Sequence, residues 1–147
     1  MKKYKRIPHV GSVMTPFPYF VDTDDEVTEV ARLMDEHHIG HIPVQQEGRV
    51  VGIVSQRDLY PLGDRISPNT DKSRIRAREI MVDNPYVVAF ETPLNEVALE
   101  LARRRIGSAI VLHHGKLAGI LSATDICRIL AEILESEFSP STGDDAA

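Results

Sequence analysis

"VVGIVSQRDL" (residues 50–59) and "LAGILSATDI" (residues 117–126) are two versions of one pattern. Each is a short apolar run with an internal glycine, followed by a serine and, three positions later, an aspartate. A serine at the end of a β-type run, with an acidic residue three positions on, is typical of a helix start. The chain therefore predicts the same strand-to-helix junction twice.

The junction belongs to a longer internal repeat. Sliding the sequence by 67 residues aligns the two halves without a gap and places Ser55 on Ser122. The matches include glycines at fixed offsets, which a chance overlap of apolar residues would not give. The matched pairs include Met14 with Met81, Tyr19 with Tyr86, Gly40 with Gly107, Gly48 with Gly115, and Gly52 with Gly119.

The first half of each repeat predicts a short extended segment followed by an amphipathic helix. The extended segments cover residues 19–21 and 86–89. Apolar residues then recur at i, i+3, i+4 and i+7 from Val27 and again from Leu94. We expect Asp25 and Thr92 to cap these helices, Pro93 to occupy a first helical position, and Gly40 and Gly107 to end them.

The second half of each repeat predicts two strands and a last helix. Gly48 and Gly115 lie between paired apolar runs, which indicates a hairpin in each repeat. The last helix starts at Ser55 or Ser122, and Pro61 cuts the first of them short.

These elements predict an α+β fold made of two tandem β-α-β-β-α units. Each unit has one apolar sheet face and one apolar helix stripe, so we expect the halves to pack sheet to sheet about a pseudo-twofold axis. The expected boundaries are 10–60 for the first unit, 61–78 for a linker rich in Pro, Gly and charge, 79–135 for the second unit, and 136–147 for a disordered tail.

The element order, the "GIVSQRD" and "GILSATD" junctions and the "HIGHIPV" start of a strand resemble the CBS domain family. Two such motifs in tandem resemble a CBS pair, or Bateman module, and the resemblance covers residues 10 to about 135. It implies an adenosine-containing ligand of the AMP, ADP or ATP type, held in the cleft between the repeats as a regulatory ligand rather than a cofactor.

The Ser-x-x-Asp spacing has two interpretations, and the residues alone leave both open. In the first, the serine hydroxyl caps the helix and the aspartate favours the positive end of the helix dipole, with no ligand involved. In the second, the helix start binds a phosphate and the carboxylate accepts hydrogen bonds from the 2′- and 3′-hydroxyls of a ribose.

The resemblance assigns ribose binding to Asp58 and Asp125, and phosphate binding to Ser55, Ser122 and Thr124. Arg57 adds a positive charge at the first site, although a solvated surface arginine is equally consistent. The family builds each site across the pair, so residues of the opposite repeat complete it. The residues expected to face Asp125 are Thr15, Tyr19, Gly40, His41 and Ile42, and those expected to face Asp58 are Val82, Tyr86, Gly107, Ser108 and Ala109.

The two expected sites differ in charge. His41 occupies a position where some relatives place a basic residue against phosphate, whereas its counterpart Ser108 is uncharged. We therefore expect the Asp125 site to prefer the more highly phosphorylated ligand. Pro43 is matched by Ile110, and "HH" at 113–114 replaces "QE" at 46–47, so the two sites need not both be occupied.

Composition narrows the remaining possibilities. A net charge of −5 argues against nucleic-acid binding. No apolar run reaches the length of a membrane span, and prolines follow the basic start of the chain, so we expect a cytoplasmic protein without a signal peptide.

The one cysteine, Cys127, allows no internal disulfide and is expected to be buried. The "HHIGH" histidines, 37, 38 and 41, are not expected to converge on a metal, and the arginines at 103–105 suit a solvated helix end.

The expected function is a stand-alone regulatory module that senses adenine nucleotides and transmits a conformational signal to an unidentified partner. The chain contains no P-loop and no nucleophile beside a base, so no catalytic residue is assigned and an enzyme such as a nucleotide hydrolase is disfavoured. A homodimer is expected. The alternative is a structural dimerisation module that gives no response to ligand.

Overall fold

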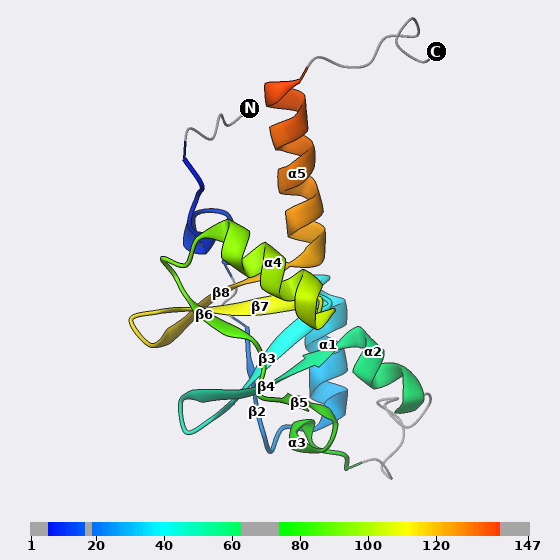
Figure 1. Cartoon of the computed structure of the whole chain (residues 1–147). Coiled ribbons are helices and arrows are strands. Elements are labelled where there is room, and N and C mark those ends of the chain that lie inside the picture. The colour runs from blue at the N-terminus through cyan, green and yellow to red at the C-terminus, as the bar shows by residue number, and fades with distance from the viewer. Residues whose placement is uncertain (1–5, 17–18, 63–73, 139–147) are drawn as a thin grey trace, which may run out of the picture. The chain divides into compact units, whose positions relative to one another are not determined.

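The structure, a computed structural model, describes residues 6–16, 19–62 and 74–138 (Figure 1). The chain divides into two compact units. One contains residues up to 17 together with 87 onward, and the other contains 18–86. The unit boundaries therefore differ from the repeat boundaries. Most of the expected linker (63–73) and of the expected tail (139–147) lies outside the described residues.

The unit of residues 18–86 is a four-stranded mixed sheet with one main helix. Strand β2 (Val21–Asp22) leads into helix α1 (Val27–His37), and β3 (His41–Gln46) then pairs parallel to β2. Strand β4 (Arg49–Ser55) returns antiparallel to β3 and runs directly into the short helix α2 (Gln56–Leu59). Helix α3 (Ala77–Ile80) and strand β5 (Val82–Asp83) complete the unit, and the strand order is β2-β3-β4-β5.

The other unit repeats this plan. Its helix η1 (Val10–Ser12) and strand β1 (Thr15–Pro16) precede β6 (Val87–Ala89), α4 (Leu94–Arg104), β7 (Ser108–His113), β8 (Lys116–Ser122) and α5 (Ala123–Glu137). The strand order is β1-β8-β7-β6, with β6 and β7 parallel and the other pairs antiparallel. The α+β class and the two tandem β-α-β-β-α motifs are confirmed.

The repeat holds at the level of single irregularities. Each hairpin has a two-residue turn with both residues at positive φ, Glu47-Gly48 in one unit and His114-Gly115 in the other. This turn type matches the right-handed twist of the flanking strands and favours glycine at its second position. The register between the hairpin strands shifts after Val44 and after Val111, which are 67 residues apart.

Each unit contains a segment contributed by the opposite repeat. Strand β1 of the first repeat pairs with β8 of the second, and β5 of the second pairs with β4 of the first. The segment before each of these short strands also pairs with the loop ahead of the main helix. Leu94 donates to the carbonyl of Pro8 at 2.9 Å, and Val27 donates to the carbonyl of Ile75 at 2.9 Å.

The ends of the main helices correct two expectations. The capping positions are Glu26 and Pro93, one residue later than the expected Asp25 and Thr92, so Pro93 precedes its helix. The helices end before left-handed residues at His38 and Arg105, not at the expected glycines. Because the amide of this left-handed residue already bonds back to the last helical turn, Gly40 and Gly107 come two residues too late to end the helix.

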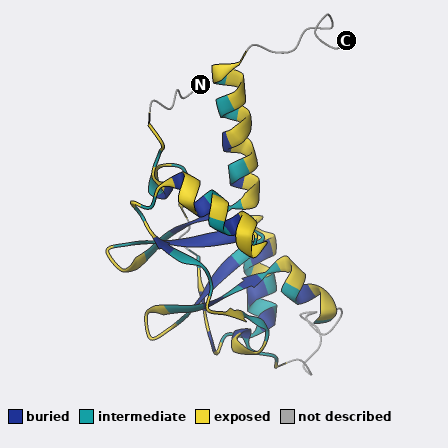
Figure 2. Cartoon of the chain, viewed as in Figure 1, coloured by how far each residue is buried: buried dark blue, intermediate teal, exposed yellow. Residues whose placement is uncertain are grey.

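The apolar periodicity correctly predicted the core. In α1 the residues at the first, fourth and eighth positions, Val27, Val30 and Met34, are buried, and Leu94, Val97 and Leu101 are buried in α4. Figure 2 shows the buried residues concentrated on the strands and the inner faces of these helices. The expectation for Cys127 was wrong, because Cys127 is exposed. The buried side of α5 runs through Asp125 and Ile129, two residues to either side of it.

Candidate functional site

Asp125 is fixed at the start of α5 by a capping box with Ser122. The Ser122 amide donates to Oδ2 of Asp125 at 2.9 Å, and the Asp125 amide donates to Oγ of Ser122 at 3.1 Å. Serine takes this place because its side chain satisfies an amide that the first turn of a helix leaves without a partner. The capping interpretation of Ser-x-x-Asp is thus realised here.

Two further side chains contact the Asp125 carboxylate. The Thr15 hydroxyl, on β1, donates at 3.4 Å to Oδ1 and lies 3.5 Å from Oδ2. The Arg128 guanidinium, one turn along α5, lies 3.5 Å from Oδ1. Asp125 itself is only 9% exposed, so it is an almost buried acidic residue with polar neighbours. Arg128 was missed by the sequence analysis, although Asp-x-x-Arg on a helix places the two side chains as neighbours.

The start of β7 lies beside this capping box. Ser108 is the register partner of Ser122, and the Ala123 amide donates to the carbonyl of Gly107 at 2.9 Å. Ser108 and Ala109 are both buried. This unit therefore contains seven of the predicted residues, with Thr124 exposed in the first turn of α5. They are Thr15, Gly107, Ser108, Ala109, Ser122, Thr124 and Asp125.

Asp58 repeats the arrangement at the start of α2. The Ser55 amide donates to Oδ2 of Asp58 at 2.7 Å, and the Ser55 hydroxyl lies 3.1 Å from the same oxygen. His41 is the register partner of Ser55, and the Gln56 amide donates to the carbonyl of Gly40 at 3.0 Å. In this unit the predicted residues Gly40, His41 and Ile42 thus lie next to the Ser-x-x-Asp of their own repeat.

The two units differ at the segment that comes from the opposite repeat. Val82 on β5 takes the place that Thr15 has on β1, pairs with Ile53 and is 52% exposed. It has no hydroxyl to offer Asp58. The position of Arg128 is taken by Pro61 in the first repeat. The positions equivalent to Thr15 and Arg128, the two polar neighbours of Asp125, are therefore apolar in the unit of Asp58.

In each unit a glycine on a central strand leaves room for the segment from the opposite repeat. Gly119 on β8 lies beside β1, and Gly52 on β4 lies beside β5. A Cβ on Gly119 would lie 2.5 Å from the carbonyl oxygen of Thr15 and 2.6 Å from Sδ of Met14. A Cβ on Gly52 would lie 2.4 Å from Sδ of Met81. The Thr15 carbonyl belongs to the main chain, so a side chain at Gly119 would displace β1, whereas one at Gly52 would require the Met81 side chain to move. The repeated methionines and glycines of the sequence are thereby explained together.

The expected partners from the opposite repeat are divided between the two units. Tyr19, Gly40, His41 and Ile42 lie in the unit without Asp125, and Gly107, Ser108 and Ala109 lie in the unit without Asp58. Their approach to these carboxylates stays a prediction. Within its own unit, Tyr19 stacks on His37 with ring centroids 3.8 Å apart.

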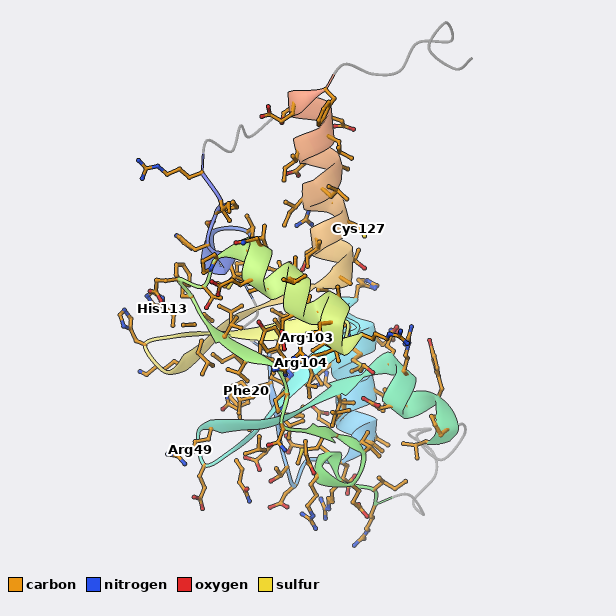
Figure 3. All side chains as sticks on the ribbon, viewed as in Figure 1. Phe20, Arg49, Arg103, Arg104, His113 and Cys127 are labelled. Atoms are coloured by element: carbon orange, nitrogen blue, oxygen red, sulfur yellow. The ribbon has the colours of Figure 1, made fainter. Side chains whose placement is uncertain are left out.

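The arginines at the C-terminal end of α4 form ion pairs with an acidic residue of the same helix. Glu100 contacts both Arg103 and Arg104 (labelled in Figure 3), with Arg104 Nε 2.5 Å from Oε1 of Glu100. Hydrogen bonds from Arg103 and then from Arg104 lower the pKa of Glu100 to about 2. This arrangement fits the solvated helix end expected for the arginines at 103–105. Among the described residues, acidic, His and Cys side chains do not gather in threes as a metal ion would require.

Both repeats of the chain match one known domain family. The model of the CBS domain matches residues 10–61 and 77–132. The chain belongs to the CBS domain family. The resemblance noted at the Ser-x-x-Asp junctions is confirmed, and both junctions of this CBS pair fall inside the matched ranges.

Similar proteins are found both among curated sequences and among solved structures. Among curated proteins, an inosine-5′-monophosphate dehydrogenase of Korarchaeum cryptofilum is 32% identical over 107 residues, covering 72% of this chain and 21% of the relative. Among solved structures, CBSX2 in complex with AMP is 28% identical with a TM-score of 0.71, and the match covers 86% of this chain and 98% of CBSX2.

A second solved structure supports the fold alone. It is a CBS domain pair in complex with 5′-methylthioadenosine and S-adenosyl-L-methionine, 22% identical with a TM-score of 0.75, and it is matched over 86% of this chain and 98% of its own. The chain spans about a fifth to a third of the length of the first curated relatives it matches. No helix within residues 6–16, 19–62 or 74–138 is long and apolar enough to cross a membrane.

Proposed function

We propose that this CBS pair is a regulatory module that binds an adenosine-containing ligand through Asp58 and Asp125 and signals its presence to a partner protein. In this proposal each carboxylate accepts hydrogen bonds from the vicinal hydroxyls of a ribose. Ser55 and Ser122, with Thr124, contact the phosphate, and the ligand is held in the cleft between the repeats.

The observation that carries the proposal is how each capping box uses its carboxylate. In both units the bond from the serine amide falls on a single oxygen, Oδ2. A carboxylate has about four acceptor positions, so capping leaves most of them for other donors. At Asp125, Oδ1 already lies within 3.5 Å of a hydroxyl and a guanidinium. Helix capping and diol binding are therefore compatible roles for the same side chain.

The comparison with CBSX2 supports the ligand class. The structure of CBSX2 contains AMP, and CBSX2 is 28% identical to this chain in a match that covers 86% of this chain. AMP contains the two groups that the Ser-x-x-Asp junction is suited to bind, a ribose diol and a phosphate. The proposal therefore names adenosine nucleotides first.

Helix length adds a reason for unequal sites. Helix α5 has 15 residues, whereas α2 has four. The positive end of a helix dipole is weak in a single turn, so the start of α5 is better suited to an anion. With His41 expected on the same side, the Asp125 site is proposed to prefer the more highly phosphorylated ligand.

A structural dimerisation module is the second candidate, and the capping boxes are compatible with it. They give Ser55, Asp58, Ser122 and Asp125 a role in the fold without any ligand. The two candidates differ in one observable property, which is whether nucleotides stabilise the folded chain.

A thermal-shift and calorimetric titration with AMP, ADP, ATP and GMP tests the proposal. A ligand at 100 times its dissociation constant adds about 2.7 kcal/mol to the stability of the native state. We expect adenine nucleotides to raise the melting temperature, and Asp58→Asn and Asp125→Asn each to remove one site. ATP should be lost mainly with Asp125.

Asp25→Asn provides the matched control. Asp25 lies in the same unit as Asp58 and accepts a main-chain hydrogen bond from Asp22 at 2.7 Å, but it is outside the proposed site. It should bind nucleotides as the wild type does. No stabilisation of the wild type by any adenine ligand would contradict the proposal and favour the structural module. Equal ligand preference at the two sites would remove the proposed asymmetry.

A further inference from the structure

Arg128 forms an ion pair with the nearly buried carboxylate of Asp125, one turn into α5. Its guanidinium lies 3.5 Å from Oδ1, and the side chains of Arg128 and Asp125 are 58% and 12% exposed. Because Asp125 precedes Arg128 by three residues, the guanidinium reaches back towards the first turn of the helix. Arg128 therefore adds a full positive charge to the positive end of the α5 dipole, where amides lack partners within the helix.

This ion pair is looser than a comparable pair on α1. Arg32 and Glu29 have the same spacing of three residues, and Nη2 of Arg32 lies 2.7 Å from Oε1 of Glu29. Both of those side chains are well exposed, whereas the acid beside Arg128 is almost buried. Taking a carboxylate out of water is costly unless its charge is paired. Arg128 therefore neutralises Asp125 but contacts it only loosely.

The two oxygens of Asp125 differ in the strength of their contacts. Oδ2 accepts a hydrogen bond of 2.9 Å from the Ser122 amide. Oδ1 lies 3.4 Å from the Thr15 hydroxyl and 3.5 Å from the Arg128 guanidinium. Hydrogen bonds to an ionised carboxylate are usually about 2.5–2.9 Å long, so a closer donor can replace these contacts. Oδ1 is thus the oxygen at which a ligand hydroxyl can displace the guanidinium.

The charge of the ligand decides whether the displaced guanidinium finds a new partner. Ribose hydroxyls are neutral, so a diol at Oδ1 replaces the hydrogen bonds of Arg128 but not its opposite charge. A phosphate on the same ligand supplies that charge, and arginine pairs readily with phosphate. The proposed function assigns the phosphate to Ser122 and Thr124, in the turn towards which Arg128 reaches. A nucleoside offers no such group.

We propose that Arg128 makes the Asp125 site select nucleotides over nucleosides. Without ligand, Arg128 is the counter-ion of Asp125, and it transfers to the ligand phosphate when the ribose diol takes its place at Oδ1. This inference rests on the proposed function and adds to it the residue that reads the phosphate. The first repeat has Pro61 at the equivalent position, so the role is assigned to the Asp125 site alone.

Calorimetric titrations of the full chain with AMP and with adenosine test this inference. The Asp58→Asn background confines the measurement to the Asp125 site. In that background Arg128→Gln should weaken AMP binding at least about tenfold, because a hydrogen bond between charged groups is lost. Adenosine binding should stay equal or become tighter, because Oδ1 loses a competing donor. The ratio of the two affinities should therefore fall at least about tenfold, whereas a merely structural role of Arg128 would lower both affinities together.

Two further variants in the same background serve as controls. Arg128→Lys keeps the positive charge and should lose less of the preference for AMP than Arg128→Gln does. Equal losses in these two variants would overturn the assigned role of the charge. Arg32→Gln is the matched control, because Arg32 has the same spacing from its acid but lies on α1, outside the proposed site. It should bind both ligands as the background does.

The outcomes separate this inference from the proposed function. An unchanged ratio of AMP to adenosine affinity in Arg128→Gln, with AMP binding that is lost when Asp125→Asn is added, would overturn this inference alone. The proposed function would then stand. If the Asp58→Asn variant binds neither AMP nor adenosine, or binds them equally well after Asp125→Asn is added, both this inference and the proposed role of Asp125 are overturned.

Discussion

The hydroxyl of Thr15 lies 3.4 Å from Oδ1 of Asp125, although the two residues are 110 positions apart. The contact exists because strand β1 of the first repeat pairs with β8 of the second, immediately before the helix that carries Asp125. Each compact unit thus joins the Ser-x-x-Asp of one repeat to the leading segment of the other. In the second unit the equivalent position is Val82, which cannot donate a hydrogen bond.

Replacing Thr15 by valine should weaken ligand binding at the Asp125 site without unfolding the chain. The valine keeps the approximate shape of the side chain and removes the hydroxyl that donates to Oδ1 of Asp125. In the proposed function this bond orients the carboxylate towards the ribose, and a hydrogen bond of this kind contributes about 0.5–1.5 kcal/mol. We therefore expect roughly a three- to tenfold loss of AMP affinity by calorimetry. Val82→Ala is the control at the equivalent position, and it should leave the Asp125 site unchanged. Equal losses in both variants would argue against a specific role for the hydroxyl.

Substituting Gly119 by alanine should displace β1 and destabilise the fold. The new Cβ would overlap the Thr15 carbonyl oxygen, which cannot move without breaking the β1–β8 pairing. Overpacking of this kind costs about 1–3 kcal/mol. Urea denaturation followed by circular dichroism measures the change in the free energy of unfolding.

Gly40→Ala is the matched control for this substitution. Its nearest neighbour would be Oε1 of Gln56 at 3.9 Å, which is an ordinary contact distance. We expect its stability to stay within about 0.5 kcal/mol of the wild type, as for other substitutions without a steric conflict. Similar losses for the two variants would show that the close approach at Gly119 does not limit stability.

Removing the capping hydroxyls should affect the two repeats unequally. Ser122→Ala leaves the Asp125 amide without its 3.1 Å acceptor at the start of a 15-residue helix. Loss of such a cap lowers the free energy of unfolding by about 0.5–2 kcal/mol. Ser55→Ala should cost less, because α2 has only four residues and little helical structure depends on its cap. A larger loss for Ser55→Ala in chemical denaturation would contradict this account.

The ion pairs of Glu100 should stabilise the fold in a defined pH range. Its pKa falls from 4.5 to about 2 through hydrogen bonds from Arg103 and Arg104. Because the folded-state pKa is depressed, the contribution is present above the unfolded value of about 4.5 and is lost as the pH falls towards 2. The effect is small because these groups are exposed, and salt should reduce it further.

Glu100→Gln isolates this contribution. The difference in unfolding free energy between the wild type and the variant should be largest above pH 5 and should shrink progressively down to pH 2. The measurement is urea denaturation at a series of pH values in low salt. A difference that is constant across this range would show that the carboxylate charge makes no contribution.

The sequence predicted the parts of the fold that depend on local pattern. Apolar spacing located the helices containing Val30 and Val97, and the hairpin turns were placed at the glycines that have positive φ. Helix ends were less predictable, because His38 and Arg105 adopt the left-handed conformation usually given to glycine. No local pattern in the sequence singles out His38 or Arg105 as the residue that takes this conformation.

Long-range features of the site could be predicted only in part. The Ser-x-x-Asp capping boxes follow from spacing within one turn, whereas the exchange of β1 and β5 between repeats depends on pairing across most of the chain.

The exposure of Cys127 was missed for a related reason. Helix α5 is apolar on two faces, and the sequence alone does not say which one is turned to the sheet.

The ribose diol provides the most direct test of the central claim, that Asp58 and Asp125 bind adenosine nucleotides through it. Calorimetric titration should compare AMP with 2′-deoxy-AMP on the full chain. Hydrogen bonds to a charged group contribute about 1.5–3 kcal/mol, so the account predicts at least about a tenfold weaker affinity for the deoxy ligand. The difference should disappear together with the site in the Asp58→Asn, Asp125→Asn double variant. Equal affinities of the wild type for AMP and 2′-deoxy-AMP would contradict the account.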